Sequence, residues 1–127
     1  MALKKEKFTI EIPIKASPSL LFEFLSTPSG LQEWFAEKVE DKGNEFTFFW
    51  GDSEDLAVQL EKEENVFVRY QWEYQGTGEF FEFRIEQSPI TNETILRITD
   101  FADKIDLGSQ KQLWETQVSD LKHRIGS

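Results

Sequence analysis

The chain contains no cysteine, one histidine and one methionine among its 127 residues. Without cysteine, disulfide bonds and thiolate metal sites are excluded, and with a single histidine we expect no metal site of another kind. No apolar run is long enough for a signal peptide or a membrane-spanning helix, so we expect a cytoplasmic protein with no membrane span. At this length we expect one domain, residues 1–127, that buries a core without covalent cross-links.

Positive charge is scarce as well. Fourteen Lys and Arg stand against twenty-four Asp and Glu, which gives a formal net charge of −10. A field of this sign repels nucleic acid and anionic membranes, so we expect no nucleic-acid partner. Aromatic residues are numerous by contrast, with twelve Phe, four Trp and two Tyr. These rings must either pack together or line a binding site.

The stretch that organises the rest of the chain is the last one, Ile105 to Ile125. Its pattern predicts a long helix with one apolar stripe. The stripe consists of Leu107, Trp114, Val118, Leu121 and Ile125. Ser109-x-x-Gln112 is typical of a capping box, although Gly108 leaves the helix start open between Asp103 and Ser109. Basic residues at 122–124 occupy the last turn, where the helix dipole favours cations.

The first third of the chain predicts one strand and two short helices. Alternating apolar residues from Phe8 to Ile14 indicate a half-buried strand, and Pro13 favours a place at or near a sheet edge. Ser17-Pro18 and Thr27-Pro28 each combine an N-cap residue with proline at the first helical position. The residues that these two helices offer to the core are Leu21, Phe22, Leu25, Leu31, Trp34 and Phe35.

From Val39 to Phe101 the apolar period is two, which predicts five or six antiparallel strands with one face in the core. The apolar residues that define these strands are Phe46, Phe48, Trp50, Leu56, Val58, Leu60, Val66, Val68, Tyr70, Trp72, Tyr74, Phe81, Phe83, Ile85, Leu96 and Ile98. We expect cross-strand charge pairs on the outer face. Its residues are Arg69, Gln71, Glu73, Glu82, Arg84, Glu86 and Arg97. The fold class is therefore α+β, with a sheet of six to seven strands and one long helix to cover it.

The run from Ser17 to Leu25, followed by Trp34-Phe35, resembles the START-like (SRPBCC) superfamily, to which the birch-pollen allergen and the START lipid-transfer domains belong. Leu113-Trp114-Glu115 is similar to the terminal helix of the group named after activators of the ninety-kilodalton heat-shock chaperone ATPase, although Leu113 stands where members often carry glycine. The resemblance covers essentially the whole chain. It implies a helix-grip fold, in which a curved antiparallel sheet wraps around the C-terminal helix, often with an apolar cavity between them.

We expect the surface between sheet and helix to be lined by large apolar side chains. The candidate cavity residues are Phe35, Phe48, Trp50, Val58, Tyr70, Trp72, Phe81, Phe83, Trp114 and Val118. Tyr70, Trp50 and Trp72 each add a hydrogen-bonding group that would orient a ligand. Two interpretations stay open: a closed aromatic core, or a cavity for a small hydrophobic ligand of lipid or polyketide-like character.

The sequence contains no recognisable catalytic set, so we expect no enzyme and no cofactor. His123 lies in the last helical turn, where its expected role is to compensate the helix dipole. The acidic loop at residues 52–55 lacks the spacing of a calcium hand. Asp100 shares the parity of Leu96 and Ile98, which would aim its carboxylate inward, but we favour a role in capping the following segment.

Two functions from different classes follow. The first is a monomeric carrier or sensor that holds a small hydrophobic ligand under the C-terminal helix. The second is a protein-interaction module of the chaperone-ATPase-activator type, whose acidic surface meets a basic surface on a protein partner. The activators proper carry a further domain that these 127 residues do not contain, which weighs against chaperone activation.

Overall fold

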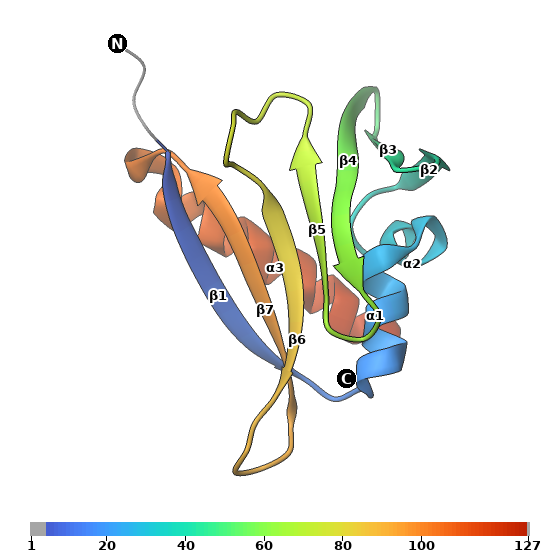
Figure 1. The fold of residues 1–127 in the computed structure, drawn as a ribbon, viewed down its shortest axis with the longest axis vertical. Coiled ribbons are helices and arrows are strands. Elements are labelled where there is room, and N and C mark those ends of the chain that lie inside the picture. The colour runs from blue at the N-terminus through green and yellow to red at the C-terminus, as the bar shows by residue number, and fades with distance from the viewer. Residues whose placement is uncertain (1–4, 127) are drawn as a thin grey trace.

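A seven-stranded antiparallel sheet and a long C-terminal helix dominate the computed structural model, which describes residues 5–126 (Figure 1). The strand order is β1-β7-β6-β5-β4-β3-β2. Figure 1 shows α3 crossing one face of the curved sheet. The elements are β1 (Glu6–Ile14), α1 (Pro18–Ser26), α2 (Pro28–Gln32), β2 (Lys38–Lys42), β3 (Glu45–Trp50), β4 (Ser53–Glu63), β5 (Phe67–Trp72), β6 (Phe81–Gln87), β7 (Thr94–Ala102), the 3-10 turn η1 (Lys104–Asp106) and α3 (Leu107–Ile125).

The predicted first strand and the starts of the two short helices are confirmed, but α2 ends at Gln32, so Trp34 and Phe35 follow this helix in a turn and do not lie on its apolar stripe as predicted. Strand β1 is an edge strand, in keeping with Pro13, which has no N–H to donate to a neighbour. The hydroxyl of Ser17 accepts a hydrogen bond from the N–H of Leu20 at 3.2 Å, as an N-cap should. The hydroxyl of Thr27 accepts from the N–H of Gly30 at 3.0 Å and caps α2 in the same way.

The long helix is confirmed, but its predicted capping box is wrong. Helix α3 begins at Leu107, directly after the turn η1, so Ser109 already lies within the first helical turn. The hydroxyl of Ser109 donates to the carbonyl oxygen of Asp106 at 3.0 Å and does not cap the helix. The basic residues 122–124 occupy the last turn as predicted, and Gly126 ends the helix in the left-handed region at φ 83°. The buried residues of α3 are Trp114, Val118 and Leu121.

Strand β4 is oriented differently from the prediction. Its aliphatic side chains are 38, 40 and 48 % exposed at Leu56, Val58 and Leu60, respectively. The buried residues of the strand are Ala57 and Gln59, which pair with the buried Phe46 of β3 and Tyr70 of β5. Residues directly opposite one another share a face, so the register of the neighbouring strands decides which face β4 presents. The expected inner position of Val58 is therefore wrong, because Val58 lies on the outer face.

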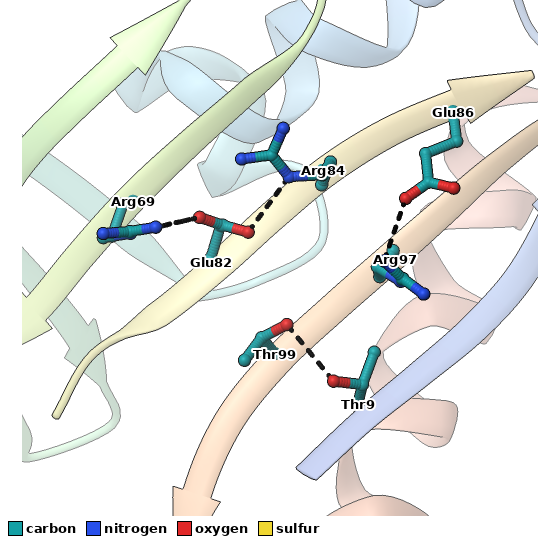
Figure 2. A network of polar contacts seen from close by, with 7 residues as sticks. All are labelled: Thr9, Arg69, Glu82, Arg84, Glu86, Arg97 and Thr99. Carbon is teal, nitrogen blue, oxygen red and sulfur yellow. Dashed lines mark hydrogen bonds and ion pairs between the residues drawn. The ribbon is translucent and has the colours of Figure 1, made fainter. Parts of the chain in front are cut away.

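The predicted charge lattice on the outer face is confirmed (Figure 2). Glu82 is 6 % exposed and accepts hydrogen bonds from Arg69 on β5, at 2.8 and 3.1 Å. Its second carboxylate oxygen accepts from Arg84 at 3.3 Å. One strand further, Arg97 forms an ion pair with Glu86 at 3.2 Å. These charges connect β5, β6 and β7 across the face that turns away from α3.

Candidate functional site

Phe35, in the turn after α2, lies at the centre of a cluster of aromatic rings between the sheet and α3. Its backbone N–H donates to the carbonyl oxygen of Leu31 at 2.8 Å, which fixes the turn and aims the ring inward. The Phe35 ring lies edge-on to Phe48, with centroids 5.2 Å apart, and parallel to Trp114 at 5.7 Å. The ring centroid of Trp72 lies 6.2 Å from that of Phe35. Such ring pairs add about 0.5–1.5 kcal/mol each beyond the area that they bury.

Two of the expected ligand-orienting groups are already paired within the chain. The buried hydroxyl of Tyr70 donates to the carbonyl oxygen of Leu25 at 2.7 Å and accepts from Gln59 at 3.3 Å. Burial raises the pKa of Tyr70 well above its usual value, and the hydrogen bond from Gln59 lowers it in part. The indole N–H of Trp50 donates to the carbonyl oxygen of Phe35 at 3.0 Å. These two side chains therefore hold backbone in place and present mainly their ring faces.

A cleft of about 740 Å³ opens beside this cluster, between the segment that follows α2 and the C-terminal half of α3. Trp34, Phe35 and Trp50 supply its aromatic wall. The remaining lining residues are Gln32, Glu33, Ala36, Glu37, Gln117, Asp120, His123 and Arg124. Trp50 is only partly buried, whereas Phe35 is 4 % exposed, so Trp50 is the more accessible of these two rings.

The polar rim of the cleft has two parts. Gln32 and Glu37 accept hydrogen bonds at 2.9 and 2.8 Å from backbone N–H groups of β2 and of the β3–β4 turn, and so hold the end of the sheet. Gln117 reaches across from α3 to the carbonyl oxygen of Phe35 at 3.5 Å. His123 and Arg124 are exposed, and within residues 5–126 neither side chain has a hydrogen bond or an ion pair. Their donor groups remain available at this rim.

The structure separates the ten candidate cavity residues into three groups. Phe35 and Trp50 line the cleft, and Val58 lies on the opposite face of the sheet. The others do not line the cleft and are at most 9 % exposed: Phe48, Tyr70, Trp72, Phe81, Phe83, Trp114 and Val118. Val118 instead lines a separate hollow between α3 and β1. Sequence reasoning did not select the helix residues of the rim. The sequence pattern that could have identified them is a polar stripe along the helix, with i, i+3 and i+7 spacing, formed by Gln117, Asp120 and Arg124.

Asp100 lies inside the molecule, so the favoured capping role is wrong and the alternative inward orientation is confirmed. It is 8 % exposed. One carboxylate oxygen accepts from the indole N–H of Trp114 at 2.9 Å and the other from the N–H of Phe101 at 2.8 Å. Burial raises the pKa of Asp100, while these two hydrogen bonds and the charge of Lys5 lower it in part. The residue thus joins the end of β7 to α3.

Within the described part of the chain, no group of three or more His, Asp or Glu residues could hold a metal ion. Among residues 5–126, no helix has both the length and the apolar character needed to cross a membrane.

The antiparallel sheet, the short helices after its first strand and the long C-terminal helix define an α+β protein of the helix-grip kind. The chain belongs to the START-like superfamily, whose domain model matches residues 1–127. No curated protein is similar enough in sequence to match it.

Three solved structures illustrate the likeness. BfR322 from Bacteroides fragilis, solved by NMR, is 31% identical, with 95% of this chain and 91% of that chain covered and a TM-score of 0.68. The Aha1 dimer from Colwellia psychrerythraea is 21% identical over 94% and 96% of the two chains, with a TM-score of 0.77. DynU16, described as a putative protein in the dynemicin biosynthetic locus, is 15% identical over 95% of this chain and 47% of its own, with a TM-score of 0.78. The last two likenesses show the fold alone.

Proposed function

We propose that this protein is a non-enzymatic, monomeric, cytoplasmic carrier or sensor that binds a small, mostly apolar ligand of lipid or polyketide-like character. The observation that carries the proposal is the cleft of about 740 Å³ with an aromatic wall. Ligand pockets have volumes of about 300–1,000 Å³ and combine apolar walls with a few polar anchors. This cleft has a suitable volume, and its three aromatic residues lie against the aromatic cluster between sheet and helix, while seven of its eleven lining residues are polar.

The lining residues favour a planar ligand with a hydrogen-bond acceptor at one end. Trp50 is the partly buried ring of the wall and is available for stacking, whereas Trp34 and Phe35 are 6 and 4 % exposed and close the wall behind it. The indole N–H groups of both tryptophans already donate to backbone carbonyl oxygens, at 2.8 and 3.0 Å. The imidazole of His123 and the guanidinium of Arg124 supply donors at the α3 rim. A carboxylate, phenolate or carbonyl group on the ligand would bind there, with its apolar body against the wall.

The packed rings behind the wall limit how deep a ligand goes. Phe35 separates the cleft from Phe81 and Trp114, with its ring centroid 6.0 and 5.7 Å from theirs. A ligand that stays in the cleft contacts the Phe35 side that faces outward. A ligand that enters the cluster must displace Phe35 first. The two modes differ in which tryptophans they affect.

The test is an NMR titration that follows the four indole N–H signals. The compounds are fatty acids, sterols, flavonoids and polyketide-like aromatics. We expect one class to give saturable shifts at Trp34 and Trp50, with smaller changes at Trp72 and Trp114 behind the wall. The same class should raise the melting temperature by mass action, equivalent to about 2.7 kcal/mol at a hundred times Kd.

Arg124→Ala is the matched binding variant, because Arg124 is exposed at the cleft rim, and Lys111→Ala on the same helix is its control. We expect Arg124→Ala to weaken the binding of acidic ligands about tenfold and Lys111→Ala to leave it unchanged. If no compound class shifts the indole signals of Trp34 and Trp50, the ligand proposal is wrong.

A further inference from the structure

The outer face of β4 carries an uncovered apolar stripe, which we call the β4 stripe. It consists of Leu56, Val58 and Leu60, with exposed fractions of 38, 40 and 48 %. A shallow hollow of about 220 Å³ lies over its first half, lined by Leu56, Ala57 and Val58 together with Glu45 and Glu73. This face is the reverse of the one that packs on α3, so the β4 stripe is separate from the cleft of the proposed function.

Elsewhere on the outer face, cationic side chains cover the apolar rings. The guanidinium of Arg84 lies 4.5 Å from the ring centre of Phe67, which is only 8 % exposed. Arg69 lies 4.3 Å from the ring centre of Phe80. Figure 2 shows both arginines held in place by Glu82. The β4 stripe, by contrast, keeps 38–48 % of each side chain exposed, so its aliphatic surface remains open to a partner.

Acidic residues lie beside and at both ends of the β4 stripe, alongside the neutral Thr47 and Gln71, which pair with Leu56 and Val58. Glu45 of β3 pairs with Val58, and the N–H of Glu73 donates to the carbonyl oxygen of Leu56 at 2.9 Å. Glu54 and Glu61 lie along β4 near the two ends of the stripe. All four glutamates are exposed, and in the described part of the chain none of their carboxylates has a hydrogen bond or an ion pair. The surface thus combines an apolar centre with an unpaired negative rim.

We infer that the β4 stripe is the docking surface for a basic amphipathic helix of a partner protein. Outward residues of a regular strand repeat about every 6.6–6.8 Å, so the stripe, whose last residue Leu60 lies at the irregularity between Gln59 and Glu61, is roughly 13 Å long. A helix of two to three turns covers this length with apolar residues at i, i+4 and i+7. Lys and Arg on both sides of that apolar row would face Glu45 and Glu73.

The observations disfavour two other occupants. A strand from a partner cannot extend the sheet here, because the backbone of β4 already pairs with β3 and β5. A second copy related by a twofold axis would place the glutamate rim against the same rim, in a chain of net charge −10. A basic helix avoids this repulsion, because its Lys and Arg side chains form ion pairs with the glutamates of the rim.

The experiment uses the full chain and a synthetic fifteen-residue helical peptide, with Leu at i, i+4 and i+7 flanked by Lys and Arg. We expect saturable methyl shifts at Leu56, Val58 and Leu60 in NMR spectra. The double variant Leu56→Thr/Val58→Thr should weaken binding at least fivefold, whereas Leu20→Gln, at another exposed leucine, should not. Both substitutions keep the residues compatible with their strand or helix.

The charge part is tested with Glu45→Gln/Glu73→Gln against the distant pair Glu93→Gln/Glu115→Gln, which changes the net charge equally. We expect only the first pair to weaken binding several-fold and to reduce its salt dependence. Equal losses in both pairs, or equal binding of a peptide with Asp and Glu flanks, overturn the inference. Concentration-dependent dimerisation that Leu56→Thr/Val58→Thr abolishes also overturns it, because a second copy is then the occupant.

Discussion

Asp100 and Tyr70 place polar groups inside an aromatic interior, and each is held by specific partners. Burying a polar group is unfavourable unless a hydrogen bond replaces the lost water. Tyr70 meets this need with the carbonyl oxygen of Leu25, and Asp100 with the indole N–H of Trp114 and the N–H of Phe101. These bonds join α1 to β5 and α3 to β7, so they also fix how the helices lie on the sheet.

We predict that the contribution of Asp100 to stability depends on pH. Burial raises the pKa of Asp100 above the ordinary aspartate value of 3.8. The folded state therefore binds this proton more tightly than the unfolded state does. The resulting stabilisation is fully present below the pKa of Asp100 in the unfolded state, and it is lost as the pH rises through the pKa of Asp100 in the folded state. The measurement is urea denaturation of wild type and of Asp100→Asn at pH 7 and at pH 4. The free energy of unfolding of wild type, relative to that of Asp100→Asn, should be higher at pH 4 than at pH 7.

The matched control for this prediction is Asp52→Asn, at an exposed loop position. The free energy of unfolding of Asp52→Asn should differ little from that of wild type at both pH values. A constant difference between wild type and Asp100→Asn across this range would contradict the prediction. Trp114→Phe removes a hydrogen bond that lowers the pKa of Asp100, so it should move the transition to higher pH.

A second prediction at this scale concerns the two tyrosines. Tyr70→Phe removes a buried hydroxyl and leaves the carbonyl oxygen of Leu25 without that donor. We expect a loss of about 1–3 kcal/mol in the free energy of unfolding. Tyr74 is 64 % exposed, so Tyr74→Phe should change stability by less than about 0.5 kcal/mol. Equal effects in the two variants, measured by urea denaturation, would argue against a structural role of the Tyr70 hydroxyl.

Among the elements, the pair α1 and α2 positions the wall of the cleft. Thr27 is both the C-cap of α1 and the N-cap of α2, so the two helices follow without a spacer. Gly30 then packs against the backbone of α1, where an added Cβ would overlap the carbonyl oxygen of Glu23 and lie 2.6 Å from the Cα of Phe24. The indole N–H of Trp34 donates to the carbonyl oxygen of Phe24 at 2.8 Å and closes this contact.

We therefore predict that Gly30→Ala destabilises the protein by about 1–3 kcal/mol, because backbone must move to make room. Gly108 in the first turn of α3 is the matched control, since an added Cβ meets no atom within 4 Å there. Gly108→Ala should be neutral or stabilising by up to about 1 kcal/mol. Thermal and urea unfolding measure both. Similar effects of the two substitutions would show that the α1–α2 contact is not tightly packed.

Over the whole molecule, an excess of ten negative charges surrounds a largely apolar interior. The described cations are partly committed to local pairs, as at Arg69 and Arg97. The remaining acidic residues repel one another, which favours expansion of the chain. This field also steers basic partners toward the protein, whichever surface they finally occupy.

We predict that salt raises the melting temperature. The Debye length falls from about 30 Å at 0.01 M to about 8 Å at 0.15 M ionic strength, so the repulsion between distant carboxylates is screened first. Close pairs such as Arg69–Glu82, with 8 % exposure of the Glu82 side chain, are screened less. Calorimetry in 0.01 and 0.15 M NaCl should show an increase of a few degrees. A decrease would mean that attractive pairs outweigh the net repulsion.

Local patterns in the sequence were sufficient to predict most helices and strands and to indicate the family. The stripe from Leu107 to Ile125, the caps at Ser17 and Thr27, and the period of two between Val39 and Phe101 all depend on residues a few positions apart. Such spacing determines helix, strand and amphipathic face directly. The element order then leaves one long helix to cover one antiparallel sheet.

The tertiary structure decided which way individual side chains face. Val58 and Ala57 are both apolar, and only the register of β4 against β3 and β5 places Val58 outside. The parity of Asp100 with Leu96 and Ile98 allowed an inward carboxylate, but only the position of α3 supplies its partner, the indole N–H of Trp114. The cleft likewise joins Trp50 of β3 to the last turns of α3, which no local spacing encodes. Orientation and cavities depend on contacts between segments far apart in the chain, whereas sequence patterns report only on neighbours along it.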